Sequence, residues 1–353
     1  MPITLIYPAP DSGWAGQRLD DILKRSLAGR EVQTISRAEE LDGLQGRRVI
    51  FALPLGDTGV NVEYTRILAR LRKESGLLAG CIGGLIVDGA GELYTKSAAA
   101  EAALALNRAG CALVGRPLVE GTGSLVNFTV QAKNLSVGLM EAYRRAASEL
   151  VERVEGFAVP QKEKPEILVL HASSHHTSNT MDLWSQIREN LENRCTIREI
   201  GLRNGTLSDC SGCPYTMCLH FGEQGGCFYG GVMQDEVYPA VRTADALVLL
   251  CPNYNDALSA NLTAFINRLT ALFRQTRFYD KAVFAIVVSG YSGGDMVARQ
   301  VVAAMNMNKS FYLPPKFALI ETANAPGEAL TLPGIGERLE WFARNIQNTL
   351  CLP

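Results

Sequence analysis

Short apolar runs alternate with amphipathic helical stretches along the whole chain of 353 residues. Runs of this length, separated by helices, are typical of βαβ units, whose parallel strands are buried on both faces of a sheet. In the first half the expected strands are Ile3–Tyr7, Val32–Ser36, Arg48–Leu53, Cys81–Val87 and Ala112–Gly115. In the second half they are Ile167–Leu170, Thr196–Ile200, Ala246–Leu250, Ala282–Val288 and Phe317–Ile320. The pattern therefore predicts an α/β fold with two tandem, doubly wound, five-stranded parallel sheets.

The two halves also match each other. The segment from Pro54 to Arg70 aligns without a gap with the segment from Pro252 to Arg268. The first strands of the two halves align at a shorter spacing, so the second half contains an added segment, about 203–235. We interpret the chain as a tandem duplication, with domains at 1–156 and 165–353. The linker between them is rich in charges, Gly and Pro.

Composition excludes several classes of partner. The 34 Lys and Arg nearly balance the 36 Asp and Glu, giving a formal net charge of −2, and no window of the sequence is strongly basic. A nucleic-acid partner is therefore not expected. No apolar run approaches the roughly 18 residues that a membrane span needs, and the first residues lack the pattern of a signal peptide. We expect no membrane partner and a cytoplasmic location, where cysteines stay reduced.

The strand Ile167–Leu170 leads into a loop, "HASSHHTSNT", that is rich in hydroxyl groups. Helical sequence follows at once, so these residues lie where free backbone N–H groups and the helix dipole favour an anion. We interpret the loop as a phosphate site, because ordinary N-capping needs only one such residue. The matching loop of the first half, "PAPDSGWAGQ", has two prolines and Asp11 instead. This difference predicts that the first domain is a degenerate copy.

Two further loops follow the third and fourth strands of the second half. "CPNYNDALSANLTAFINRL" places Tyr254 where a ligand lies in a doubly wound fold, and its ring suits a planar aromatic molecule. A turn followed by a capped helix is the alternative interpretation. "SGYSGGD" contains three glycines, which allow close backbone approach or serve the turn itself. All three loops are expected at the carboxyl edge of one sheet.

About 165–327 resembles the NADPH-dependent FMN reductase family of the flavodoxin-like superfamily, which includes the iron–sulfur flavoproteins. The resemblance rests on "ASSHHTSNT", on "CPNYNDALSANLTAFINR" and on the cysteine segment "CSGCPYTMC". It implies two flavodoxin-like sheets and bound FMN. The implied contacts of the FMN phosphate are Ser173, His175, Ser178, Asn179 and Thr180. The implied neighbours of the isoalloxazine ring are Pro252, Asn253, Tyr254, Asn255, Ser289, Gly290 and Gly293.

The resemblance further implies an FMN-dependent oxidoreductase that passes electrons from NAD(P)H to a small acceptor, such as a quinone, free flavin or iron centre, or to a redox protein. No residue is assigned as catalytic, because the flavin carries the redox chemistry. The alternatives are an iron–sulfur electron carrier that does not use NAD(P)H and a non-catalytic scaffold that has lost its flavin. For assembly we expect a monomeric pseudo-dimer, in which the first domain covers the second, or a homodimer.

Four cysteines of the added segment have the spacing C-x2-C-x4-C-x8-C: Cys210, Cys213, Cys218 and Cys227. Thiolates at such spacing can converge on one soft ion or cluster. The sequence leaves three alternatives open, namely an iron–sulfur cluster, zinc and no metal. Cys81, Cys111 and Cys251 lie on or beside apolar runs and are expected to be small core residues.

Overall fold

The computed structural model describes residues 2–10, 16–173 and 177–353. The chain divides into two compact units, residues 1–158 and 159–353. In the described part of the chain, no helix has the length and the hydropathy that a membrane crossing requires.

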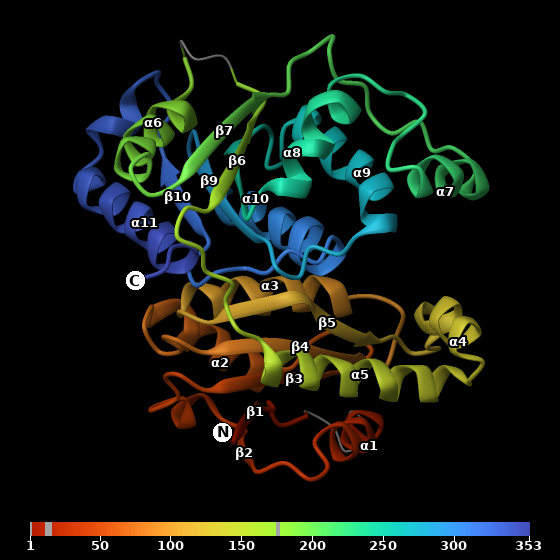
Figure 1. Ribbon diagram of the computed structural model, residues 1–353. Coiled ribbons are helices and arrows are strands. Elements are labelled where there is room, and N and C mark those ends of the chain that lie inside the picture. The colour runs from red at the N-terminus through yellow and green to blue at the C-terminus, as the bar shows by residue number, and fades with distance from the viewer. Residues whose placement is uncertain (1, 11–15, 174–176) are drawn as a thin grey trace. The chain divides into compact units, whose positions relative to one another are not determined.

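The first unit contains a five-stranded parallel sheet in the order β2-β1-β3-β4-β5 (Figure 1). Its strands are β1 (Ile3–Ile6), β2 (Val32–Ile35), β3 (Arg48–Leu55), β4 (Ile82–Gly89) and β5 (Ala112–Gly121). The helices α1 (Gln17–Ser26) and α5 (Leu139–Gly156) cover one face, and α2 (Val62–Lys73) and α3 (Thr95–Arg108) cover the other. The short helix α4 (Thr129–Leu135) packs against α5, and two 3-10 turns are η1 (Ala38–Glu40) and η2 (Val126–Phe128).

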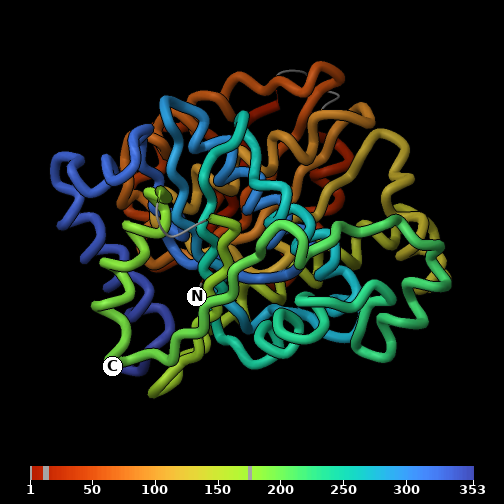
Figure 2. The backbone as a smooth tube through the Cα atoms, turned by 90° about the horizontal axis from the view of Figure 1, so that it is seen from above, coloured from red at the N-terminus to blue at the C-terminus, as the bar shows by residue number. Residues whose placement is uncertain are grey.

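The second unit repeats this topology, with the sheet order β10-β9-β8-β6-β7. Its strands are β6 (Glu166–His171), β7 (Thr196–Gly201), β8 (Ala246–Pro252), β9 (Ala282–Ser289) and β10 (Ala318–Thr322). The helices α6 (Asn179–Leu191) and α11 (Ile335–Leu350) lie side by side (Figures 1 and 2). The other helices are α7 (Tyr215–Glu223), which packs on α9, then α8 (Tyr238–Thr243), α9 (Ala260–Gln275) and α10 (Gly294–Val301). Two π-helical turns, η3 (Met233–Val237) and η4 (Val302–Asn308), and the 3-10 turn η5 (Glu328–Thr331) complete the unit.

Both sheets have the flavodoxin-like order, so the predicted fold class is confirmed. The physical basis is visible in the second sheet. Every residue of the interior strand β9 is buried, as its unbroken apolar sequence predicts. The edge strand β7 has only one neighbouring strand, and its first four residues alternate between exposed and partly buried positions, while Ile200 is buried.

The predicted end of one strand was wrong. β5 was expected to stop at Gly115 but continues to Gly121. Its register with β4 shifts between Gly83 and Leu85, and Arg116 has a left-handed φ of 50°. The pairing is interrupted around Pro117, which has no N–H to donate, and resumes with Leu85 opposite Leu118.

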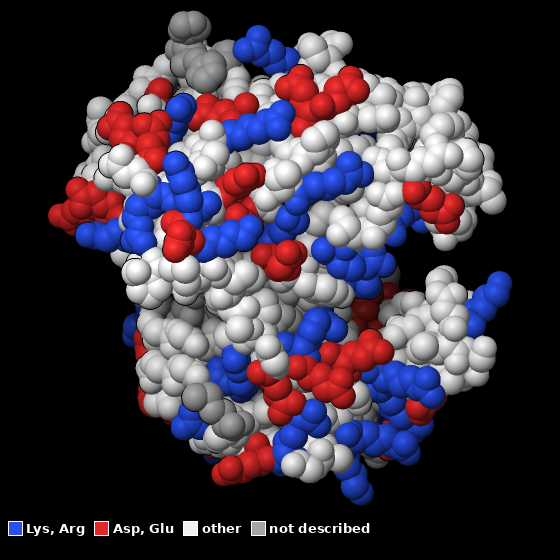
Figure 3. Space-filling view, in the orientation of Figure 1, with Lys and Arg blue, Asp and Glu red and all other residues white. Residues whose placement is uncertain are grey.

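Lys and Arg alternate with Asp and Glu on the face of the molecule that Figure 3 shows. Neither sign of charge forms a continuous area on this face. This pattern agrees with the near-zero net charge of the chain.

A buried ion pair closes the carboxyl edge of the first sheet. Arg18 donates from Nε and Nη2 to both carboxylate oxygens of Asp88, at 2.9 Å and 3.1 Å. Its Nη1 and Nη2 also donate to the carbonyls of Gly123 and Gly89. Burial raises the pKa of Asp88, and the Arg18 guanidinium opposes this shift. The pair thus joins α1 to the ends of β4 and β5.

We expect Arg18→Met to lower the free energy of unfolding by about 2–4 kcal/mol at pH 7.5, because it leaves a buried carboxylate without its cation. Loss of Arg18 raises the pKa of folded Asp88 further above its unfolded value. A carboxyl group whose pKa is higher in the folded than in the unfolded state stabilises the fold at low pH, and this stabilisation is lost as the pH rises through the folded-state pKa. The loss of unfolding free energy in Arg18→Met is therefore smaller at pH 5 than at pH 7.5. Urea unfolding at both pH values measures the difference.

Arg145→Met is the matched control, since Arg145 pairs with Glu141 on the exposed surface of α5. It should cost less than about 1 kcal/mol at either pH. An Arg18→Met deficit that is equally large at pH 5 and pH 7.5 would contradict our account of Asp88.

Candidate functional site

A cavity of about 560 Å³ lies at the carboxyl edge of the second sheet. The loops that follow β6, β8, β9 and β10 line it. Nine of the predicted site residues are in its wall: Ser173, Ser178, Asn179, Thr180, Pro252, Asn253, Tyr254, Asn255 and Gly290. Ser289 and Gly293 lie beside these residues without lining the cavity, and His175 lies outside the described residues. The structure therefore brings the three predicted loops together.

The loop after β6 ends at the N-cap of α6. The Ser178 side chain accepts a hydrogen bond from the backbone N–H of Met181 and exchanges one with Thr180 Oγ1 at 2.9 Å. One hydroxyl thus caps the helix, as ordinary capping requires. The positive end of the α6 dipole faces the cavity wall, where it favours an anion.

Ser173 is not explained by capping. Its Oγ is buried and has no hydrogen-bond partner among the described residues, although the residue lines the cavity. A buried hydroxyl without a partner costs free energy, and a ligand in the cavity would supply the missing bond. The cavity wall thus contains an unused hydroxyl, which suits a polar group of a ligand.

The side chain of Asn179 has a structural role that the sequence did not reveal. Its Nδ2 donates to the carbonyl of Ala325 at 2.9 Å, and its Oδ1 accepts from the N–H of Ala329 at 3.2 Å. These bonds attach the segment after β10 to the start of α6. The amide is therefore already satisfied, and the backbone of Asn179 is what remains available to an anion.

The loop after β8 forms a miniature hairpin. Tyr254 and Ala257 exchange backbone hydrogen bonds of 3.2 Å and 3.1 Å around the two residues between them. Those residues, Asn255 and Asp256, both have left-handed φ angles of 53° and 58°. A two-residue loop with two positive φ angles has the pattern of a type I′ turn, for which Asn and Asp are suited. The Asn-Asp pair thus follows from turn chemistry, and the turn presents Tyr254 at the cavity.

Asn253 connects two loops. Its Nδ2 donates to Ser289 Oγ at 3.1 Å and to the carbonyl of Ser292 at 3.0 Å. Its Oδ1 is buried and has no partner among the described residues. The cavity wall thus offers an unused acceptor, which suits an N–H group of a ligand.

Gly293 permits the close contact between the two loops. Its φ is +83°, and a Cβ at this position would stand 2.0 Å from Oδ1 of Asp256. Gly290 is similarly close to Asn324, whose Oδ1 would lie 2.9 Å from an added Cβ. Both glycines therefore allow neighbouring loops of the wall to approach more closely than a larger residue would permit.

The wall also includes Ala172 and Thr177 of the predicted phosphate loop. The sequence did not single out its remaining members, which are Asp256, Val288, Tyr291, Ser292, Ala323 and Asn324. Ala323 and Asn324 follow the fifth strand of the sheet, whose carboxyl end lies at the same edge, and this position was the sequence signal that could have identified them. Tyr291 is 82% exposed and its OH accepts from Asn324 Nδ2 at 3.0 Å. With Tyr254, which is 55% exposed, it gives the cavity mouth two aromatic rings. Asp256 is the one charged side chain among the described residues of the wall.

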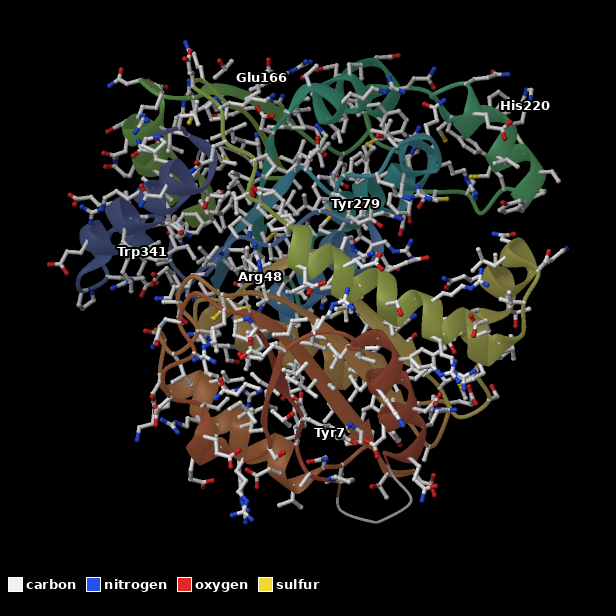
Figure 4. The ribbon with its side chains drawn as sticks, turned by 60° about the horizontal axis from the view of Figure 1, so that its bottom comes forward. Tyr7, Arg48, Glu166, His220, Tyr279 and Trp341 are labelled. Carbon is white, nitrogen blue, oxygen red and sulfur yellow. The ribbon has the colours of Figure 1, made fainter. Side chains whose placement is uncertain are left out.

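The sequence left open whether the four cysteines of the added segment hold an iron–sulfur cluster, zinc or no metal. Cys210 is exposed, and Cys213, Cys218 and Cys227 are partly exposed. Within the described residues, which include the whole added segment, no three His, Cys, Asp or Glu side chains are grouped to hold a metal ion. Cys218 lies within α7 while the others precede or follow this helix, so the spacing does not bring the four thiols together. His220, which lies within α7, is also exposed (Figure 4).

The cysteines expected in the core are buried. Cys81, Cys111 and Cys251 lie in or next to strands. Burial raises the pKa of the Cys251 thiol, which keeps it protonated and unreactive.

Residues 165–325 match the model of the family described as NADPH-dependent FMN reductase. The second half of the chain is thus similar in sequence to this family, as the resemblance indicated. The match covers somewhat less than half of the chain. No curated protein matches the sequence.

Solved structures similar to this chain include an NAD(P)H:quinone oxidoreductase from Methanothermobacter marburgensis. It shares 16% identity and a TM-score of 0.41, over 52% of this chain and 98% of the other. An azoreductase from Bacillus anthracis str. Sterne shares 14% identity and a TM-score of 0.38, over 51% of this chain and 97% of the other. An FMN-dependent NADH-azoreductase from Bacillus anthracis str. Ames Ancestor, solved with FMN, shares 11% identity and a TM-score of 0.35, over 52% of this chain and 99% of the other.

We expect Gly293→Ala to lower the free energy of unfolding by about 3 kcal/mol or more, because it adds a clash with Asp256 to the strain of a left-handed residue. Gly327→Ala is the matched control. Gly327 has a similar φ of +78°, but a Cβ there would meet nothing within 4 Å. This control should cost only about 1 kcal/mol, as thermal and urea unfolding of both variants will show. Equal losses in the two variants would mean that the hairpin does not depend on close approach at Gly293.

Proposed function

We propose that the second unit binds FMN and catalyses the oxidation of NAD(P)H with reduction of a small acceptor. The observation that carries the proposal is the cavity itself, whose wall contains the two unused polar atoms of Ser173 and Asn253. The cavity lies in the part of the chain that matches the family model. Its volume falls in the range of about 300–1,000 Å³ that is common for cofactor sites.

The phosphate of FMN fits the end of the cavity formed by the loop after β6. The proposed contacts are the hydroxyls of Ser173, Ser178 and Thr180 and the backbone N–H groups at the start of α6. His175 remains a proposed contact from the sequence alone. No Lys or Arg is among the described residues of the wall, so neutral donors and the helix dipole provide the attraction.

The ring of FMN fits the other end, against Pro252, Asn253, Tyr254, Asn255 and Gly290. The free Oδ1 of Asn253 suits an N–H on the polar edge of the ring, and Tyr254 offers an aromatic face. Ser289 and Gly293 lie next to Asn253 outside the cavity lining and help to position it. When bound, FMN supplies the capacity to accept a hydride and to release electrons. The chain binds and orients the flavin, and we propose no side chain as an acid or base.

The open mouth of the cavity leaves room for NAD(P)H and then for the acceptor. Two exposed tyrosines, Tyr254 and Tyr291, stand at this mouth. Flat, uncharged ring systems pack well against such side chains. We therefore propose an acceptor of this kind, such as a quinone or free flavin.

The first unit is proposed to bind no flavin. At the corresponding edge of its sheet, Arg18 and Asp88 bond each other and fill the place at the start of α1. The cavity beside them measures only about 230 Å³. One FMN per chain is the stoichiometry that follows. An iron–sulfur cluster does not fit the observed cysteines, so no electron path through one is proposed.

Ser173→Ala should weaken FMN binding about 10- to 100-fold, because a hydrogen bond to a charged phosphate is lost. Riboflavin lacks the phosphate, so its affinity should hardly change. Quenching of flavin fluorescence on titration measures both. Thr206→Ala removes a surface hydroxyl that bonds the carbonyl of Arg203, and it should change neither affinity. A Ser173→Ala variant that loses FMN and riboflavin equally would place this hydroxyl away from the phosphate.

Protein reconstituted with FMN should oxidise NADPH or NADH when a quinone is supplied, and flavin-free protein should not. Absorbance at the nicotinamide band follows the reaction, and the flavin released on denaturation gives the stoichiometry. About one FMN per chain is expected. Bound FMN without turnover of either nucleotide would instead favour an electron carrier, and the absence of bound FMN would refute the proposal.

A further inference from the structure

Two cysteines outside the candidate site form a close pair. The Sγ atoms of Cys195 and Cys351 lie 3.8 Å apart, and both residues are buried, each with 3% of its surface exposed. Neither residue belongs to the cysteine segment 203–235. The pair lies at the amino edge of the second sheet, just before β7, and so on the opposite edge from the cavity.

The surrounding bonds hold the two backbones in place. Gln347 Nε2 donates to the carbonyl of Asn190 at 2.7 Å, on one side of the thiols. On the other side, Arg194 donates to the carbonyl of Leu352 at 2.5 Å. α6 and α11 lie side by side (Figure 2), and Cys195 and Cys351 follow these helices in the chain, so the two thiols meet between the ends of the two segments.

We propose that Cys195 and Cys351 are an oxidation site, at which a reversible disulfide ties the C-terminal end of α11 to the start of β7. Neither thiol has a role in the proposed flavin chemistry, so the inference is independent of that function. The two thiols are already in contact, and a disulfide requires the sulfurs to approach from 3.8 Å to the bond distance of about 2 Å.

The oxidant is a small disulfide, such as oxidised glutathione. One cysteine, as its thiolate, attacks the oxidant, breaks its S–S bond and releases one glutathione thiol. The second cysteine then attacks the mixed disulfide, forms the protein disulfide and releases the other glutathione. In total the two cysteines lose two protons and two electrons, and the oxidant becomes two thiols.

The local environment predicts how fast this occurs. Burial, together with the neighbouring Cys351, raises the pKa of Cys195 to about 12. The reactive thiolate is therefore scarce at pH 7 and increases about tenfold per pH unit. The other groups that face the pair are the guanidinium of Arg194, which opposes the shift, and the carbonyl of Arg194, which is 4.0 Å from Cys351 Sγ. Access to the pair requires the segment around Cys351 to separate from Lys162, whose backbone bonds Leu350 and Leu352.

The test uses the full chain with Cys210, Cys213, Cys218 and Cys227 replaced by Ser, so that surface thiols do not react. After incubation with oxidised glutathione at pH 8.5, we expect a mass lower by about 2 Da and one cross-linked peptide that contains Cys195 and Cys351. The melting temperature should rise by about 5 °C or more, and dithiothreitol should reverse every change. The initial rate should fall about tenfold at pH 7.5.

Cys251→Ala in the same background is the control. Cys251 is buried, and its Sγ bonds the carbonyl of Leu249 instead of another thiol, so this variant should still form the cross-link. Cys351→Ser should abolish the cross-link and the rise in melting temperature. If that variant does not fold, the peptide map of the parent protein still decides. Recovery of Cys195 and Cys351 as free thiols after prolonged oxidation, or their presence only as separate glutathione adducts, would overturn the proposal.

Discussion

Parallel strands run in one direction, so every connection must cross the face of the sheet and every strand ends at the same edge. The rest of this structure depends on that constraint. It requires helices on both faces, which is why the central strands β8 and β9 are apolar along their length. It also gathers loops that are distant in sequence, so that segments after β6, β8, β9 and β10 surround one cavity. The site is thus a consequence of strand direction, and the loop sequences determine what it can bind.

The two units show how much the loops matter. They share one strand order, yet their carboxyl edges differ in charge and in space. In the first unit Arg18 and Asp88 satisfy each other and three carbonyls nearby, so a polar ligand would have to displace existing bonds. In the second unit the hydroxyl of Ser173 and the amide oxygen of Asn253 are unused. A buried polar atom without a partner is costly, and at the carboxyl edge of the second sheet a ligand in the cavity would supply the missing bonds.

Several site residues also have structural roles, which the sequence pattern could not distinguish from a role in ligand binding. Ser178 caps α6, Asn179 holds the segment after β10, and Asn255 occupies a left-handed position of a tight turn. Ligand binding and ordinary turn or cap chemistry, the two interpretations of these loops, are therefore compatible, since the turns and caps shape the cavity wall that a ligand would contact. The cysteines separate in a similar way. The four that look like a motif are spread over an exposed segment, whereas Cys195 and Cys351, which have no motif, are in contact.

The sequence by itself determined the fold class, the duplication and the three principal loops, because apolar periodicity and strand-to-helix junctions are local properties of the chain. It also located nine residues of the cavity wall, since the carboxyl ends of parallel strands must share an edge. Only the tertiary structure decided the rest. The extension of β5 past Pro117, the Arg18–Asp88 pair and the Cys195–Cys351 contact all join residues far apart in sequence or depend on a local irregularity. Such contacts arise from packing in three dimensions, and no spacing along the chain records them.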